Sequence, residues 1–270
     1  MEISNNNSST PRKRQRIEDD TVPESHDPAQ SLSLESSLIF SDTMAALNMM
    51  RAQFPRNDKV TIEPFILRSQ LYSSIKDRTQ VDRELESLRR EKVVRIFKLN
   101  TGQDDHAVIF MEDYLNQMKR AVKSMETKKQ CVLDVFKWFE VHVIHSKLEP
   151  CIGHQELWSL LSIGGKVKDG DISLLINAGL LTRQLIDPDM YWFAIPYIGS
   201  VLKGLTQGRK ELLSLLNRKK YKEMMLALLE KSRLRLSPLD IRFHLRDLLG
   251  SGHLKTVHTP SGIVIRVSKD

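Results

Sequence analysis

A single pattern recurs three times along this sequence: an amphipathic helix, a short strand, a polar turn and a second strand. In the first copy Thr79 is placed to cap a helix. The apolar positions of this helix are spaced four and then three residues apart, at Val81, Leu85 and Leu88. Strands over 93–99 and 106–111 follow, with a polar turn between them. The pattern restricts the chain to α+β folds assembled from small repeated units.

The second and third copies keep this order. The second has a helix with Ile172, Leu175 and Ile176, followed by strands over 180–186 and 191–195. Pro188, in the turn between these strands, presets φ and cannot lie in a central strand, so it marks the hairpin tip. In the third copy the segment 237–240 (Ser-Pro-Leu-Asp) is expected to open a helix, with Ser237 as the cap and proline at the first helical position. Its strands are expected over 254–258 and 263–267.

Two further helical patterns precede each copy. They lie at 34–53 and 64–74, at 112–145 (broken near 123–128) and 155–161, and at 198–217 and 221–231. Three helices followed by a two-stranded wing form the winged variant of the helix-turn-helix. We therefore predict an α+β, mostly helical fold of three tandem winged helices with short two-stranded wings. The expected limits of the three domains are 32–111, 112–196 and 197–270.

Residues 1–31 form a tail that we expect to be disordered, because it is polar and has too few large apolar residues for a core. A compact basic cluster in this tail, at Arg12, Lys13, Arg14 and Arg16, is typical of a nuclear-import signal. No run approaches the 18 apolar residues of a membrane span, and residues 1–10 lack the apolar stretch of a secretory signal. We therefore expect a nuclear protein without a membrane partner.

The basic residues are concentrated at one end of the chain. From Lys203 to Asp270 there are 15 Lys/Arg and 6 Asp/Glu, a net charge of +9. The remaining 202 residues have 26 basic and 28 acidic side chains, a net charge of −2. A basic excess confined to one region favours a surface for a polyanion. The alternative is the solvated helix face of an ordinary basic protein.

The third predicted winged helix is therefore the expected DNA-binding part. Its basic residues gather in and around its first two helices: Lys203, Arg209, Lys210, Arg218, Lys219, Lys220, Lys222, Arg233 and Arg235. Its third helix, which reads bases in many winged helices, contributes only Arg242, His244 and Arg246. Because most of the charge lies where a helix would follow the DNA backbone, we expect binding to duplex DNA that is largely independent of sequence.

The first two winged helices are less suited to DNA. The third helix of the first contains Asp82, Glu84 and Glu86 beside its arginines, and that of the second begins with Asp169 and Asp171. Carboxylates that face phosphates offset the attraction of neighbouring basic residues. We therefore interpret these two units as protein-binding modules.

The residues predict neither a catalytic centre, a metal site nor a cofactor. His142, His145, Cys151 and His154 lie close in sequence, but their spacing matches no standard structural zinc finger. Two cysteines, Cys131 and Cys151, are too few for a disulfide framework and suit a reducing compartment. The tryptophans are interpreted as core residues instead of a platform on which bases stack.

Five segments carry a resemblance to a known family. They are 65–72 (Phe-Ile-Leu-Arg-Ser-Gln-Leu-Tyr), 77–79 (Asp-Arg-Thr), 109–114 (Ile-Phe-Met-Glu-Asp-Tyr), 176–181 (Ile-Asn-Ala-Gly-Leu-Leu) and 208–210 (Gly-Arg-Lys). From about residue 35 to the C-terminus, the chain resembles the serine/threonine-protein kinase 19 family. The resemblance implies a nuclear tandem winged-helix protein that binds DNA and acts in transcription-coupled nucleotide excision repair. The partners it implies are the Cockayne-syndrome ubiquitin ligase, stalled RNA polymerase II and TFIIH.

The family's DNA-facing positions can be carried over by alignment. They point to Arg78, Lys203, Arg218, Lys220 and Arg233. At two places where the family has basic residues, this chain has Asn217 and Ser232, and the neighbouring Lys219 and Arg233 are expected to compensate.

Despite the family's name, the sequence lacks the parts that phosphoryl transfer requires. It contains no G-x-G-x-x-G, no H-R-D and no D-F-G, and Gly164-Gly165-Lys166 lacks the lead and the Ser/Thr of a P-loop. We therefore expect no enzyme activity. The main alternative to DNA binding is an interaction scaffold whose basic face meets an acidic partner. Exposed apolar surface on the first winged helix also leaves a homodimer open.

Overall fold

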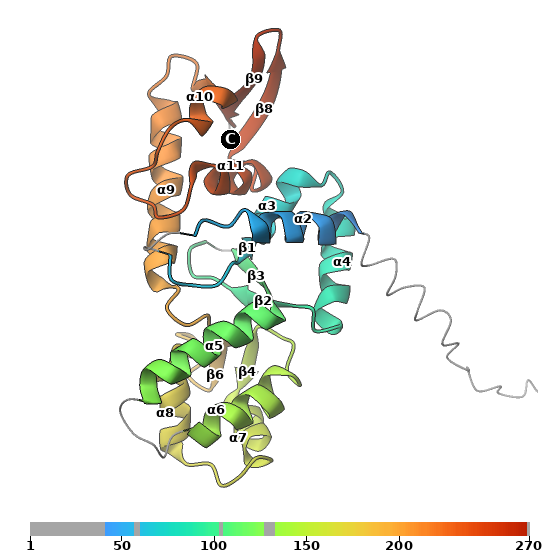
Figure 1. Cartoon of the computed structure of the whole chain (residues 1–270), viewed down its shortest axis with the longest axis vertical. Coiled ribbons are helices and arrows are strands. Elements are labelled where there is room, and N and C mark those ends of the chain that lie inside the picture. Colours follow the sequence, from blue (N-terminus) through green and yellow to red (C-terminus); the bar gives the residue numbers. More distant parts are fainter. Residues whose placement is uncertain (1–40, 57–59, 103–104, 127–132, 269–270) are drawn as a thin grey trace, which may run out of the picture. The chain divides into compact units, whose positions relative to one another are not determined.

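The computed structural model describes residues 41–56, 60–102, 105–126 and 133–268, all of which fall within one compact unit (Figure 1). The predicted tail 1–31, its basic cluster Arg12, Lys13, Arg14 and Arg16, and Cys131 lie outside these residues. Among the helices described, none is long and apolar enough to cross a membrane. The domain limits at 112 and 197 stay predictions.

The first winged helix has the order helix, strand, helix, helix, strand, strand. Its elements are α2 (Asp42–Ala52), β1 (Ile66–Leu67), α3 (Arg68–Ser74), α4 (Arg78–Arg90), β2 (Val94–Lys98) and β3 (His106–Phe110). The strands form an antiparallel sheet in the order β1-β3-β2, with Ile96 opposite Val108 in the β2–β3 hairpin.

The second winged helix repeats this order after an added helix, α5 (Met111–Glu126). Its elements are α6 (Leu133–Trp138) continued by the π-helix η2 (Phe139–Ile144), β4 (Cys151–Gly153), α7 (His154–Ser162), α8 (Asp169–Asn177), β5 (Leu181–Arg183) and β6 (Met190–Phe193). Gly179, at φ +73°, ends α8 in a conformation that favours glycine. The sheet order is β4-β6-β5.

The third winged helix repeats the order again. It contains α9 (Gly199–Asn217), β7 (Glu223–Met225), α10 (Leu226–Glu230), α11 (Ile241–Gly250), β8 (Leu254–Thr259) and β9 (Gly262–Val267), with the sheet order β7-β9-β8. The predicted fold class is confirmed: the chain is α+β and mostly helical, with the winged-helix order present three times.

The expected two-stranded wings are present as the hairpins β2–β3, β5–β6 and β8–β9, but each sheet also has a third strand that the sequence patterns do not predict. These strands, β1, β4 and β7, have two or three residues and come just before a helix. The sequence patterns predict helices throughout 64–74 and 221–231. In the structure, a short strand precedes the helix in each of these segments. Such short strands carry no period of their own and form only because a distant strand, such as β3 for β1, supplies their hydrogen bonds.

Two predicted helix caps are also wrong. The cap of α4 is Asp77, not Thr79, and its carboxylate accepts hydrogen bonds from the backbone N–H of Thr79 and Gln80. The cap of α11 is Asp240, not Ser237, and it accepts from the N–H of Phe243. A side-chain oxygen caps a helix only where the backbone turns into it, and several candidates stand side by side in both segments.

Arg95 joins the first two winged helices in a continuous core. Its side chain leaves β2 and is 1% exposed, and its Nη1 donates to the backbone oxygens of Ile144 and Lys147 at 2.9 Å. The guanidinium lies 4.2 Å from the ring centroid of Phe193, a cation–π contact that replaces part of its lost hydration. Burial lowers the pKa of Arg95.

The first and third winged helices meet where α11 packs on α3 (Figure 1). The backbones come very close, because a Cβ added at Gly250 would lie 1.6 Å from the carbonyl oxygen of Ser69. Gln70 Nε2 donates to the carbonyl of Phe243 at 3.0 Å, and Ser69 Oγ donates to Asp247 Oδ1 at 2.6 Å. The third helix of the third unit is therefore an internal packing surface.

We predict that Gly250→Ala lowers the free energy of unfolding by at least about 2 kcal/mol, because backbone atoms must shift to admit the methyl group. The matched control is Gly170→Ala in α8, where an added Cβ meets nothing within 4 Å. Urea unfolding of both variants checks this prediction. Equal stability of the two variants would contradict the close packing of α11 on α3.

Candidate nucleic-acid interface

The basic residues of α11, the third helix of the third winged-helix unit, are paired or buried. Arg242 forms an ion pair with Glu230 at 3.3 Å, and His244 is completely buried. Arg246 donates to the side-chain oxygen of Gln53, which follows α2, at 2.5 Å. Because α3 covers α11, this helix cannot enter a major groove in the observed arrangement.

Arg209 lies between two carboxylates from different winged helices. It forms ion pairs with Asp105 and with Asp247, both at 2.6 Å, and its side chain is only 17% exposed. Burial alone would lower the pKa of Arg209, but hydrogen bonds to Asp247 and Asp105 raise it overall. The same pairing lowers the pKa of Asp105 against the effect of burial. Arg209 was predicted to contact DNA, and the structure places it inside the protein instead.

Arg78 was also predicted to contact DNA. Its guanidinium lies 5.1 Å from the ring centroid of Tyr72 and donates to the carbonyl of Gly250 at 3.0 Å. This bond caps the end of α11, so Arg78 links the first and third winged helices. The residue stays exposed, but one of its donors is already used.

The other eight predicted residues are all exposed, and we call them the α9 basic surface. They are Lys203, Lys210, Arg218, Lys219, Lys220, Lys222, Arg233 and Arg235. Among the residues that the structure describes, none of these side chains forms an ion pair with a carboxylate. Their charge is therefore available to an external anion.

The outward face of α9 orients the first two of these residues. Lys203 and Lys210 are seven residues apart, which is two helical turns or about 10 Å along the axis. The apolar residues of the opposite face, Val201, Leu205, Leu212 and Leu216, are buried. Between and beyond the two lysines this face carries Gln207, Ser214 and Asn217, all polar and uncharged.

The turn after α9 holds four basic residues in a fixed conformation. Backbone bonds run from the N–H of Lys219 to Leu216 and from that of Lys222 to Lys219, at 2.9 and 3.0 Å. Lys222 has φ +52°, and its carbonyl accepts from the N–H of Val267. The ammonium of Lys220 lies 5.3 Å from the ring centroid of Tyr221. This turn joins β7 to the end of α9, so its charges lie next to the C-terminal end of the helix that carries Lys203 and Lys210.

Glu211, an acidic residue on α9, does not pair with the side chains of the α9 basic surface. Its carboxylate accepts from the backbone N–H groups of Arg235 and Leu236 at 2.9 to 3.1 Å. It therefore holds the segment before α11 against α9 and brings Arg235 to the edge of the helix. Two exposed basic residues outside the predicted set, Lys231 and Lys255, flank this region. Lys231 lies two residues before Arg233 in a basic segment of the sequence, whereas Lys255 has no basic neighbour and local charge density does not reveal it.

The third helices of the other two units differ in charge. On α4, Arg89 and Arg90 both pair with Glu86 at 2.8 Å, so much of the positive charge there is neutralised locally. On α8 the first turn carries Asp169 and Asp171. These features agree with the interpretation that acids offset the basic residues in both units.

The possible chemical sites show structural roles. Gly164 and Gly165, considered above as part of a P-loop, lie against the indole of Trp138, and a Cβ at either would come within 2.4 Å of it. His154 Nδ1 lies 3.0 Å from the hydroxyl of Tyr191. Burial raises the pKa of the Cys151 thiol, so this thiol is a poor nucleophile. Within the described residues, no three His, Cys, Asp or Glu side chains gather in a way that could hold a metal ion.

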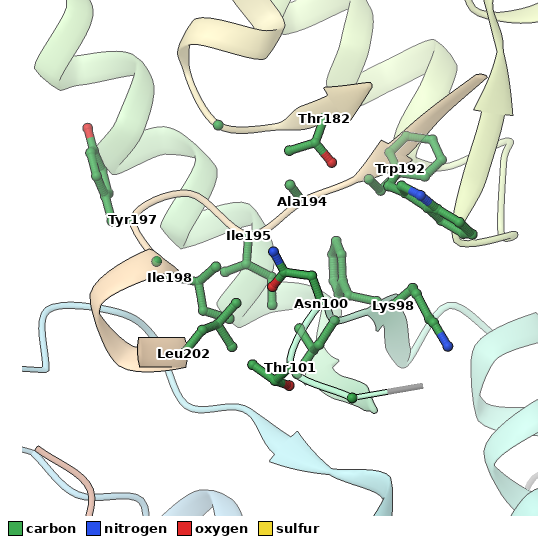
Figure 2. Close-up of a pocket in the computed structure, with 16 residues that line it drawn as sticks. Lys98, Asn100, Thr101, Thr182, Trp192, Ala194, Ile195, Tyr197, Ile198 and Leu202 are labelled. Carbon is green, nitrogen blue, oxygen red and sulfur yellow. The ribbon is translucent and has the colours of Figure 1, made fainter. Parts of the chain in front are cut away.

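An open pocket of about 750 Å³ lies between the first wing, β6 and the start of α9 (Figure 2). Trp192, Ile195, Ile198 and Leu202 give it an apolar wall, and Asn100, Thr101 and Thr182 are among the residues that contribute polar atoms. Its 16 lining residues include one charged residue, Lys98, and no His, Cys, Asp or Glu. The titratable side chains of its lining are Lys98 and Tyr197.

Comparison with known proteins finds matches along most of the chain. A family model described as "Inactive serine-threonine protein kinase 19" matches residues 35–267. The chain is similar to the protein named Winged helix repair factor 1 of Xenopus laevis, with 33% identity over 235 residues, covering 84% of each chain. The human protein of this name is 30% identical over 227 residues, covering 83% of this chain and 84% of that protein. The mouse protein is 32% identical over 221 residues, covering 79% and 81%.

His244, beside the Arg209 network, leads to a prediction about pH. Burial is the main cause that lowers its pKa from 6.5 to about 4; Arg209 adds to the effect, and Asp247 and Glu211 oppose it. The unfolded chain takes up this proton below about pH 6.5, whereas the folded protein does so only near pH 4. The free energy of unfolding should therefore fall as the pH is lowered through this window, by about 3 kcal/mol from this residue.

We predict that His244→Gln makes the pH dependence of stability between pH 6.5 and 4 shallower. The matched control, His258→Gln, replaces an exposed histidine of β8 and should leave the slope unchanged. Urea unfolding at several pH values measures both slopes. If the two variants keep the same slope as the parent protein, His244 is not the buried neutral group described above.

Proposed function

This chain belongs to the family described as inactive serine-threonine protein kinase 19, and on that premise we propose that it is a nuclear, non-catalytic winged-helix protein that binds duplex DNA through the α9 basic surface and acts in DNA repair. The observation that carries the DNA-binding part is the set of eight exposed basic side chains without ion-pair partners among the described residues. The names of the relatives support the repair part.

The arrangement of these residues favours contacts with phosphates over contacts with bases. Lys203 and Lys210 project from the side of a helix, and the other six residues lie in two turns next to it. The helix that reads bases in many winged helices, α11, is packed against α3. Contacts with phosphates position a protein on DNA but carry no sequence information, so binding should depend little on sequence.

We further propose that the protein works in transcription-coupled nucleotide excision repair and bridges stalled RNA polymerase II complexes and downstream DNA. The partners implied by the family resemblance are the Cockayne-syndrome ubiquitin ligase, RNA polymerase II and TFIIH. The first two winged helices, with mixed or acidic third helices, suit protein contacts better than DNA contacts. The basic cluster Arg12, Lys13, Arg14 and Arg16 supports import into the nucleus.

The lack of catalysis is proposed on three grounds. The family model's description calls the family inactive, the kinase motifs are missing from the sequence, and the glycines 164 and 165 pack against Trp138. We predict that purified protein incubated with Mg²⁺ and labelled ATP transfers no phosphate to peptide substrates above the background of a mock preparation. Activity that follows the protein through every purification step would overturn this.

We predict that the double variant Lys203→Glu, Lys210→Glu lowers affinity for duplex DNA by at least about tenfold at physiological salt, because it replaces two attractive charges by two repulsive ones. The matched control is Lys119→Glu, Lys166→Glu, which makes the same change of net charge at exposed lysines of α5 and of the second winged helix. Fluorescence anisotropy with a labelled duplex measures both affinities. Equal weakening by the two variants would mean that net charge, and not the α9 basic surface, governs binding.

The parent protein should show log affinity falling with log salt concentration at a slope of about −4 to −5, as expected for four to six neutralised phosphates. It should bind shuffled duplexes equally well. A strong preference for one sequence would contradict backbone binding. If plain duplex DNA is not bound at physiological salt, the alternative holds: an interaction scaffold whose basic face meets an acidic protein.

A further inference from the structure

The tip of the second wing presents two large aliphatic side chains to solvent. Leu185 is 102% exposed and Ile186 is 98% exposed, more than any other large hydrophobic residue among those described. A scattered, partly exposed aliphatic residue is ordinary on a protein surface. Two neighbouring residues with their whole side chains in water, at the end of a projecting hairpin, need an explanation.

The tip is held in place by backbone hydrogen bonds. The N–H of Gln184 donates to Met190, and the N–H of Met190 donates to Asp187, at 2.9 and 3.1 Å. The N–H of His154, at the start of α7, donates to the carbonyl of Asp189 at 2.7 Å. The aliphatic pair is therefore presented on a preorganised turn, so little conformational entropy is lost when a partner covers it.

Among the described residues, the other two wings do not have an exposed aliphatic pair of this kind at the tip, so the pair is not a general property of the repeat. Near the tip of the first wing, Asp105 is paired with Arg209 inside the protein. The third wing, residues 254–267, has no acidic residue and carries Lys255 and Arg266 beside the basic third unit. The second wing alone combines an exposed aliphatic pair with two exposed carboxylates, Asp187 and Asp189.

These carboxylates decide what kind of partner the tip fits. Asp187 and Asp189 outnumber the exposed Arg183 of the same wing, so the tip has a net negative charge that disfavours a DNA duplex or an anionic membrane surface. A protein pocket that is apolar inside and lined with lysine or arginine at its rim complements both the aliphatic pair and the charges.

We propose that Leu185 and Ile186 are the anchor by which this chain docks into an apolar pocket, with a basic rim, on a partner protein. The inference rests on the proposed function, since it names a surface for the protein contacts of a repair assembly. It is separate from DNA binding, because the second wing contributes nothing to the α9 basic surface.

The first step of the test replaces Leu185 by the photo-crosslinking residue p-benzoylphenylalanine in the full-length chain, expressed in cells of its source. The matched control carries the same residue in place of Pro260, at the tip of the third wing. Mass spectrometry of the adducts identifies the joined peptide. We expect an adduct specific to position 185, mapped to a protein surface that is apolar and flanked by lysine or arginine.

The second step measures the affinity of the purified chain for that purified protein. The double variant Leu185→Ser, Ile186→Ser should weaken it by at least about 30-fold, as expected for a buried anchor. Asp187→Lys with Asp189→Lys should weaken it and reduce its dependence on salt. Leu228→Ser, which changes a half-exposed leucine of α10, should leave it unchanged.

Several results would overturn the inference: adducts at position 185 with a second copy of this chain, with nucleic acid or with lipid, or no adduct beyond the control. A mapped surface that is acidic, or serine variants that bind as tightly as the parent, would also overturn it. The serine variant must keep the parent's unfolding midpoint and DNA affinity, which excludes misfolding. Failure of the parent chain to bind duplex DNA would instead count against the proposed function and leave the docking result intact.

Discussion

The contact between the first and third winged helices depends on a mostly buried arginine, Arg209. Arg209 of α9 bonds to Asp247 of α11 in its own winged helix and to Asp105 of the first wing, so a single side chain joins elements of two repeats. Two carboxylates at 2.6 Å accept hydrogen bonds from this arginine and compensate for its lost hydration. Asp247 also accepts from Ser69 of α3, so the network extends to the surface that covers α11.

This packing determines which surfaces remain for partners. Once α11 is held against α3, the third winged helix cannot use its third helix on DNA, and its external basic residues are those on α9 and in the adjoining turns. The acidic residues nearest to them are occupied: Glu211 accepts from two backbone amides, and Glu223 pairs with Arg266. The positive charge that is left is therefore exposed without an internal counter-charge, as a polyanion site requires.

The three repeats share one order of elements but use equivalent parts differently. The first wing contributes Asp105 to an internal ion pair, the second ends in an exposed aliphatic pair with carboxylates, and the third has no acidic residue and carries Lys255 and Arg266. Likewise α4 carries internally paired charges on its exposed face, α8 begins with acids, and α11 packs against a neighbouring unit. A fold sets where an element lies, and the side chains that it carries decide its function.

The sequence by itself determined the three helix-and-hairpin units, the turn at Pro188 and the region of basic excess, because these depend on residues near one another in the chain. It missed β1, β4 and β7, which are too short for a period and exist only by pairing with distant strands. It also treated Arg209 like its neighbour Lys210, although one is paired inside the protein and the other faces solvent. Tertiary structure decides this difference, because Arg209 and Asp105 are 104 residues apart in the sequence and no local pattern predicts that they form an ion pair.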